Sequence, residues 1–196
     1  MLLKLELRRQ IRHAAGYVAL AAVALLLSLG AGNSADAVKT RPPLMLAAEQ
    51  IILVERFAEP YTEQGYSVTP AGAVREWVKT RLQADGTPGI VRVILLDAQI
   101  KRQELKTKGG LRGWFSDDQK YRYDGRIHVR VEYQPAIPGQ HASNAEAQAS
   151  GYFTMPEDAT LNQLDKQASA LAQDLMRRTD MELENNMLRH MPGIVR

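Results

Sequence analysis

Apolar and polar side chains alternate most regularly between residues 121 and 133. Tyrosine, isoleucine and valine take the odd positions apart from Gly125, while charged side chains and His128 take the even positions. A period of two is typical of a strand with one buried face and one solvated face. We therefore predict an antiparallel strand over residues 121–133.

Three further segments have the patterns of strands. Residues 50–57 are short and rich in strand-forming residues. Residues 90–105 are apolar on both faces in their first half and alternate in their second half, which predicts a central strand. Residues 144–154 alternate again, and the inward set is mostly small: Ala145, Ala147, Ala149, Gly151 and Phe153. Small inward side chains leave room for a helix to approach the sheet closely.

The first helical pattern follows Thr69 and Pro70. A threonine before a proline is a favourable helix start, because threonine caps the first turn and proline suits its first position. Apolar side chains then recur at helical spacing, with basic and acidic side chains between them. The sequence Asp-Gly-Thr-Pro-Gly at residues 85–89 ends the pattern. We predict a helix over residues 69–84.

A second and longer helical pattern extends from about Pro156 to Met191. Its apolar stripe is regular from Leu161 to Leu175. Beyond Arg177 the apolar positions drift away from this stripe, which favours a last segment that projects and contacts a partner. The candidate partner-binding residues are Met181, Leu183, Met187, Leu188 and Met191.

The order of these elements is β-α-β-β-β-α. A right-handed crossover joins the first strand to a parallel neighbour, and hairpins join the others. The predicted fold class is α+β: a two-layer sandwich with a four-stranded, mostly antiparallel sheet and two helices on one face. We assign residues 48–191 to a single domain. Residues 38–47, with two adjacent prolines, are predicted to be a linker, and residues 192–196 a tail.

The N-terminus has the layout of a secretory signal. Residues 4–13 are basic, residues 16–32 are apolar, and Ala35-Asp36-Ala37 resembles a signal peptidase site. Residues 1–37 are thus a signal peptide or a signal-anchor. Cleavage near Ala37 predicts a soluble periplasmic protein, whereas retention predicts a protein tethered to the inner membrane by residues 16–32.

The composition of the chain restricts both its partners and its covalent modifications. Residues 1–37 carry four basic and two acidic side chains, so the net charge of +3 for the whole chain leaves about +1 for the remainder. Global charge therefore does not predict a polyanionic partner. The sequence contains no cysteine, which excludes disulfides and a lipid-modified cysteine.

No motif in the sequence indicates catalysis. The four histidines have no zinc-ligand spacing, and no phosphate-binding loop or nucleophile motif is present. The glycines of residues 109–113 and the pair Asp117-Asp118 are typical of a loop. We predict that the protein is not an enzyme, with no catalytic residue, no metal and no cofactor.

The solvated side of the predicted sheet is rich in cations. Basic residues on strand 121–133 would share it with Lys101, and the loop before that strand adds further cations and two aromatic residues. Cations beside exposed aromatics could bind an anionic amphiphile, although a polar strand face is also typical of simple solvation. Predicted export disfavours nucleic acid. The candidate ligand-binding residues are Lys101, Lys106, Lys108, Arg112, Trp114, Phe115, Arg122, Arg126, His128 and Arg130.

The exported N-terminus, the helix start at Thr69-Pro70 and the strand 121–133 occur in an order that resembles the LptE and YajG-like envelope proteins. These are small α+β domains of the Gram-negative periplasm, and the resemblance covers about residues 48–190. It implies an accessory of lipopolysaccharide or lipid transport and outer-membrane assembly, since LptE-type proteins dock into an outer-membrane barrel. Those families are mostly lipoproteins, whereas this chain has no cysteine.

Two functions follow as hypotheses. The first is a non-catalytic periplasmic envelope protein that binds a protein partner or an anionic glycolipid close to a membrane. The second is a structural subunit of a membrane-anchored envelope complex that acts only through protein–protein contacts. The sequence leaves the oligomeric state open.

Overall fold

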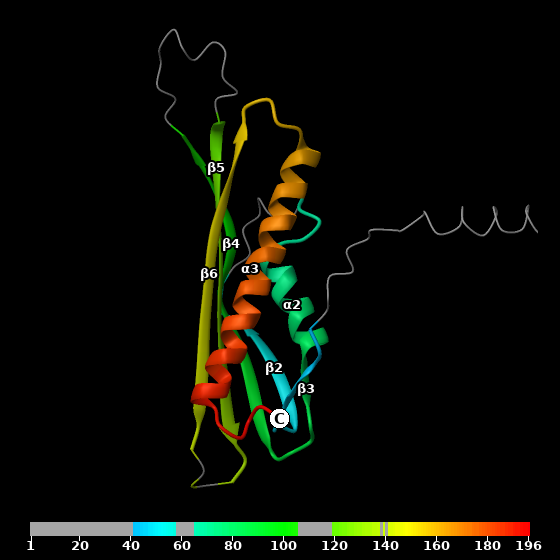
Figure 1. Cartoon of the computed structure of the whole chain (residues 1–196), viewed down its shortest axis with the longest axis vertical. Helices are drawn as coiled ribbons and strands as arrows, with labels where there is room; N and C mark the ends of the chain where they lie inside the picture. Colours follow the sequence, from blue (N-terminus) through cyan, green and yellow to red (C-terminus); the bar gives the residue numbers. More distant parts are fainter. Residues whose placement is uncertain (1–40, 58–64, 106–118, 138, 140) are drawn as a thin grey trace, which may run out of the picture. The chain divides into compact units, whose positions relative to one another are not determined.

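A computed structural model describes residues 41–57, 65–105, 119–137, 139 and 141–196. Within these residues, two helices pack on one face of a four-stranded sheet (Figure 1). The strands of this sheet, in spatial order, are β2 (Gln50–Glu55), β4 (Gly89–Glu104), β5 (Gln119–Pro135) and β6 (Ser143–Pro156). The helices are α2 (Pro70–Arg81) and α3 (Leu161–His190). The α+β fold class is therefore confirmed.

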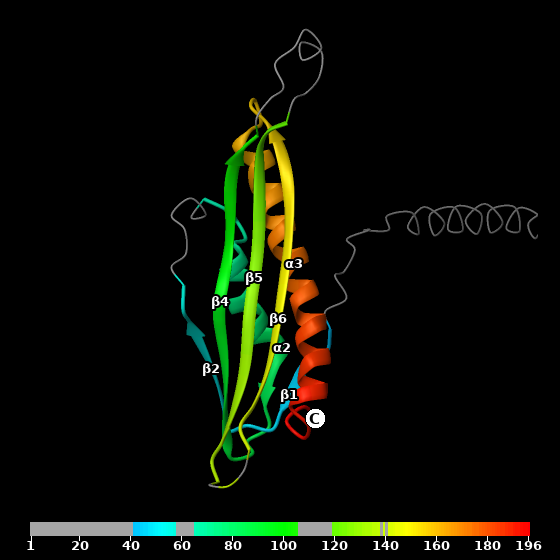
Figure 2. The same cartoon turned by 90° about the vertical axis from the view of Figure 1, so that its left-hand side faces the viewer.

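The sheet is mostly antiparallel, as predicted. β2 pairs with β4 in parallel, while β4 with β5 and β5 with β6 are antiparallel. Figure 2 shows the four strands in front of both helices, so no described helix or strand covers the near face of the sheet. We call this uncovered side the open face.

A register shift between Leu95 and Asp97 interrupts β4. Before the shift Arg92 is opposite Glu132 on β5, and after it Lys101 is opposite Asp124. The extra residue exchanges the two faces of β4, so odd-numbered residues after the shift lie on the open face. The predicted placement of Lys101 on the solvated side is therefore confirmed.

Helix α2 begins where the sequence predicts and ends earlier. The Thr69 side chain accepts a hydrogen bond of 3.0 Å from the Gly72 backbone N–H. The helix ends at Arg81, and the chain continues without a loop into a short strand, β3 (Leu82–Ala84). The predicted last turn is wrong because the extended backbone of β3 pairs in parallel with β1 (Leu44–Leu46).

The small β1–β3 sheet changes the ends of the predicted domain. Leu44 and Leu46 are buried, so the last part of the predicted linker belongs to the core. The C-terminal residues also pack here: the Ala47 N–H donates to Ile194 O at 2.7 Å, and the Arg196 N–H donates to Met45 O at 3.0 Å. The predicted tail is therefore bound to β1. Strand β1 and the C-terminal residues 192–196 are each too short to show a periodic pattern, so the sequence did not predict that they pack on the domain.

Helix α3 begins at Leu161 instead of near Pro156. The Thr160 side chain accepts from the Gln163 backbone N–H, and the Gln163 side chain accepts from the Thr160 backbone N–H at 2.8 Å. This reciprocal capping box satisfies two backbone donors at the helix start. The helix therefore begins after Thr160, and the preceding residues Pro156, Glu157 and Asp158, where the sequence predicts its start, lie outside it.

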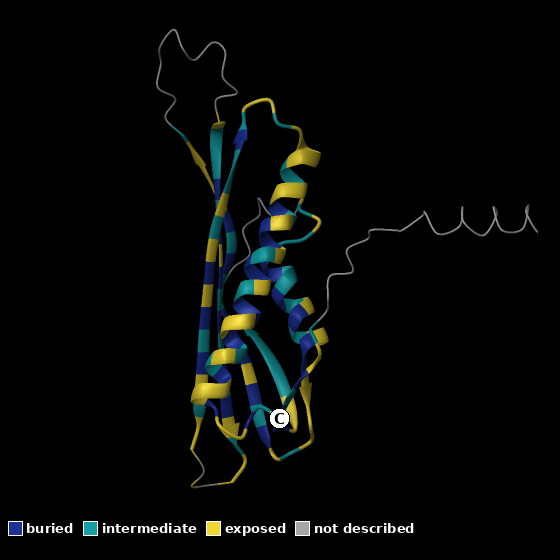
Figure 3. Ribbon diagram, viewed as in Figure 1, coloured by how far each residue is buried: buried dark blue, intermediate teal, exposed yellow. Residues whose placement is uncertain are grey.

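Small side chains of the sheet lie under α3, as predicted. Ala145, Ala147 and Ala149 on β6 are buried, and buried and exposed residues alternate along this strand (Figure 3). Gly125 on β5 is directly opposite Gly151 on β6. A Cβ atom on Gly125 would lie 2.7 Å from Leu171 Cδ2, and one on Gly151 would lie 3.0 Å from Leu171 Cδ1. The two glycines therefore allow Leu171 of α3 to reach the backbone of the sheet.

The C-terminal half of α3 does not project from the fold. Leu183, Met187 and Met191 are at most 1% exposed and belong to the core. Their assignment to a partner-binding surface is wrong, because they belong to the same core cluster as Leu44 and Leu46 of β1 and Ile194 near the C-terminus. Met181 and Leu188 remain exposed, at 40% and 56%.

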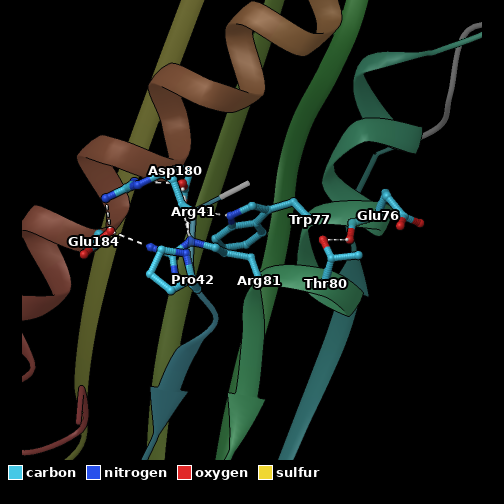
Figure 4. Close-up of polar contacts among 8 residues, drawn as sticks. All are labelled: Arg41, Pro42, Glu76, Trp77, Thr80, Arg81, Asp180 and Glu184. Atoms are coloured by element: carbon cyan, nitrogen blue, oxygen red, sulfur yellow. Dashed lines mark hydrogen bonds and ion pairs between the residues drawn. The ribbon is translucent and has the colours of Figure 1, made fainter. Parts of the chain in front are cut away.

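A buried ion-pair cluster connects the two helices to the segment that precedes β1 (Figure 4). Asp180 on α3 is 6% exposed and accepts from Arg41 Nη1 at 2.7 Å and from Trp77 Nε1 at 2.9 Å. Arg81, equally buried, lies 3.2 Å from Asp180 and donates to Glu184 at 2.6 Å. We call these five residues the Asp180 cluster. Arg81 also donates to Pro42 O, so the cluster fixes where the chain enters β1.

Candidate functional site

The open face of the sheet combines cations from β4 and β5. Even-numbered residues of β5 lie on this face, and the register places Arg126 opposite Gln99 on β4 and Ser150 on β6. Lys101 is one pleat further along β4, opposite Asp124. The alternation of β5 and the bulge in β4 together bring these side chains to one surface.

A shallow groove of about 460 Å³ crosses the open face at this point. We call it the open-face groove. Its lining comes from three strands, and it includes the backbone of Gly125 and Gly151. The other lining residues are Asp97, Gln99 and Lys101 on β4, Arg122, Asp124 and Arg126 on β5, and Ser150 and Tyr152 on β6.

The cations of the groove differ in how firmly they are paired. Arg122 bonds Asp124 at 2.8 Å and lies 3.9 Å from the centroid of the Tyr152 ring. Arg126 is 3.8 Å from Asp97, a long ion pair, and also donates to Gln148. The Lys101 side chain makes no ion pair or hydrogen bond with any described residue. Lys101 and Arg126 therefore have the charge that is most available to an anion.

The other predicted cations of β5 are neutralised by the neighbouring strand. Arg130 donates to Glu146 at 2.7 Å, and His128 Nε2 lies within hydrogen-bond distance of the same carboxylate. Hydrogen bonds from Arg130 and His128 hold the pKa of Glu146 below its ordinary value, while Glu146 raises the pKa of Arg130. Because Arg130 and His128 already contact Glu146, this part of the open face is less suited to bind an anionic ligand.

Five predicted ligand-binding residues lie outside the described residues. They belong to the segment 106–118 between β4 and β5. Their contribution to a site stays a prediction. These residues are Lys106, Lys108, Arg112, Trp114 and Phe115.

Tyr152 is a residue of the groove that the sequence reasoning missed. Its side chain is 59% exposed and stacks under the Arg122 guanidinium. The signal was available, because Tyr152 has the parity of the solvated residues of β6. Its pairing with Arg122 depends on the β5–β6 register, which places Asp124 opposite Tyr152.

The described residues contain neither a candidate metal-ligand group nor a candidate membrane-spanning helix. Among them, no three histidine, cysteine or acidic side chains lie close enough to hold a metal ion. In the same part of the chain, no helix combines the length and apolar character that a membrane span needs. The predicted signal or anchor, residues 1–37, lies outside the described residues.

Comparisons with known proteins give structural neighbours only. No family model and no curated protein matches the chain. It is similar to the rare lipoprotein B from Shewanella oneidensis, at 14% identity over 69% of this chain and 92% of that chain, with a TM-score of 0.37.

Two other solved structures match to a comparable extent. One is a minor lipoprotein from Acinetobacter baumannii, at 15% identity over 74% of this chain and 96% of that chain, with a TM-score of 0.39. The other is an uncharacterized lipoprotein B from Nitrosomonas europaea, at 11% identity over 74% of this chain and 86% of that chain, with a TM-score of 0.36. All three neighbours are described as lipoproteins, whereas this chain contains no cysteine. At these identities and TM-scores, the likeness assigns neither a ligand nor a partner to this chain.

Proposed function

We propose that this chain is a non-catalytic, LptE-like envelope protein that binds an anionic glycolipid through the open-face groove, as an accessory of lipid transport or outer-membrane assembly. The observation that carries the proposal is the pair of available cations, Lys101 and Arg126, beside the exposed ring of Tyr152. The secretory pattern of residues 1–37 supports a position outside the cytoplasm.

The chemistry of the groove suits a phosphorylated headgroup. Arginine offers a planar fork of donors to a phosphate, and lysine offers a compact charge. The ring of Tyr152 presents an apolar surface next to them. Asp97 and Asp124 limit the net positive charge of the lining, which favours a specific headgroup over any polyanion.

Charge reversal of the two available cations tests this function. The double variant Lys101→Glu/Arg126→Glu should bind lipopolysaccharide-containing phosphatidylcholine vesicles at least about 30-fold more weakly, because each basic residue near an anionic surface contributes about 1 kcal/mol. Vesicle co-sedimentation of the purified protein measures the affinity, and vesicles without lipopolysaccharide give the background.

A matched control carries the same change in charge on the helix layer. Lys79→Glu/Lys166→Glu alters two exposed lysines on α2 and α3, and its affinity should stay within about threefold of wild type, since a distant charge is screened. Equal affinities of the open-face variant and of wild type would refute glycolipid binding by the groove.

A second candidate function is a structural subunit that acts through protein contacts. Met181 and Leu188 support it, because both are exposed and lie two turns apart on one side of α3. In this version, the exposed side of α3 packs against another envelope protein.

The variant Met181→Glu/Leu188→Glu tests the second function. It should move the protein in gently solubilised membrane extracts from a large species to the size of the free chain, because charges in an apolar interface are costly. Gln167→Glu/Gln173→Glu, also exposed on α3, is the matched control and should leave the large species in place. An unchanged size distribution for the first variant counts against this function.

A further inference from the structure

A second hollow lies on the opposite side of β4, between the sheet and the first turns of α3. Its volume is about 890 Å³, within the range of about 300 to 1,000 Å³ that is usual for ligand sites. We call it the α3 cleft. Its described lining residues are Gly65, Tyr66, Gln99, Ile100, Lys101, Arg102, Tyr123, Leu161, Leu164 and Asp165.

The walls of the α3 cleft are largely apolar. Ile100 and Tyr123 form its sheet side and are at most 5% exposed, while Leu164 is partly buried on the helix side. Leu161 stands at the first turn of α3 with 84% of its surface exposed. An exposed leucine beside a concave apolar wall is suited to cover an apolar ligand.

The α3 cleft and the open-face groove meet at the edge of β4. β2 pairs with β4 only as far as Leu95, so the later residues of β4 have no strand partner on that side among the described residues. Gln99 and Lys101 line both hollows. Among the described residues, the two hollows therefore share part of their lining at this edge of β4.

The charges at the edge of β4 indicate where the anionic headgroup and where the apolar chain of a ligand would lie. Lys101 is unpaired among the described residues and stands at the junction of the two hollows. Arg102 is on the cleft side, 4.7 Å from the centroid of the Tyr121 ring. An anionic group would be stabilised at the junction, while the cleft beyond it offers mainly apolar contact.

We propose that the α3 cleft binds the unbranched hydrocarbon chain of an anionic amphiphile whose headgroup lies at Lys101. The inference rests on the proposed function, since it uses the same headgroup site, and it adds a separate site for the apolar part. The occupant is an alkyl or acyl chain, because one end of the ligand must reach a cation and the other must fill an apolar cleft.

Chain length is the first test. Octyl, decyl and dodecyl phosphate, each below its micelle concentration, serve as probes for the purified protein in titration calorimetry, with inorganic phosphate as the chain-free reference. Each added methylene that enters the cleft should raise the affinity about fourfold. Equal affinity across the series, or no binding of any of the three, would overturn the inference.

Leu161→Glu is the second test. The side chain is exposed at the first helical position, where a carboxylate suits the helix dipole, so the variant should fold normally. It should bind dodecyl phosphate about tenfold more weakly or worse, since an apolar contact is lost and a like charge is added. Ile137→Glu makes the same kind of change at an apolar residue that is 56% exposed and lines neither hollow, so it is the matched control and should bind as wild type does.

The outcomes separate this inference from the proposed function. Weaker vesicle binding by Lys101→Glu/Arg126→Glu together with no chain-length dependence would retain the headgroup site and reject the α3 cleft. Chain-length dependence that Leu161→Glu leaves unchanged would place the hydrocarbon elsewhere and also reject it. Unchanged vesicle binding by the double variant would reject the proposed function itself.

Discussion

Asp180→Ala should lower the free energy of unfolding by about 3 to 5 kcal/mol. The substitution removes the acceptor of Arg41, Arg81 and the Trp77 indole, and Arg81 would keep its charge in a position that is only 6% exposed. Breaking a buried ion pair by deleting one partner is costly in this range. Glu184 would then be the one carboxylate of the cluster left to Arg41 and Arg81, so one of these two positive charges would lose its compensation. Urea unfolding followed by circular dichroism measures the effect.

Asp174→Ala is the matched control for this prediction. Asp174 pairs with Arg177 and Arg178 on the same helix, and all three side chains are well exposed. Surface pairs of this kind contribute about 1 kcal/mol or less. A loss at Asp180 no larger than the loss at Asp174 would show that the Asp180 cluster does not connect the helices energetically.

Met187→Ala should destabilise the fold by about 2 to 5 kcal/mol, whereas Leu188→Ala should change its stability by less than about 0.5 kcal/mol. The two residues are neighbours in the sequence, but Met187 is fully buried and Leu188 is 56% exposed. Truncating the buried side chain leaves a cavity in the core, while truncating the exposed one removes little contact. The same urea titration serves for both variants.

This pair of variants also tests where the core ends. If Met187→Ala were neutral, the last turns of α3 would not be part of the core, and the original assignment of Met187 to a partner surface would return. Equal losses at both positions would indicate that a partner in the sample covers Leu188.

Periodic segments were the part of the fold that could be predicted from the sequence. The alternation of residues 121–133 and of residues 144–154 identified β5 and β6 and their inward faces. The reason is physical: a half-buried strand must place apolar side chains on every second residue. The parallel pairing of β1 with β3 was missed, because strands of three residues are too short for a period and their partner is distant in the chain.

The candidate site was predicted in part for the same reason. Parity alone placed Lys101 and Arg126 on one surface. Which cations would be neutralised could not be predicted, because the contact of Glu146 with Arg130 depends on the β5–β6 register. The Asp180 cluster also escaped prediction, since Arg41, Arg81 and Asp180 come from three separate segments and none of them breaks a local pattern.

The pair Gly125 and Gly151 has a consequence for both layers of the fold. Leu171 packs on these residues from the helix side, and the same two residues line the open-face groove on the other side. At these two residues the groove is thus separated from the core by a single thickness of peptide backbone. A headgroup seated there would be separated from α3 by one layer of main chain, so any force that it exerts on the floor is transmitted to Leu171 without an intervening side chain.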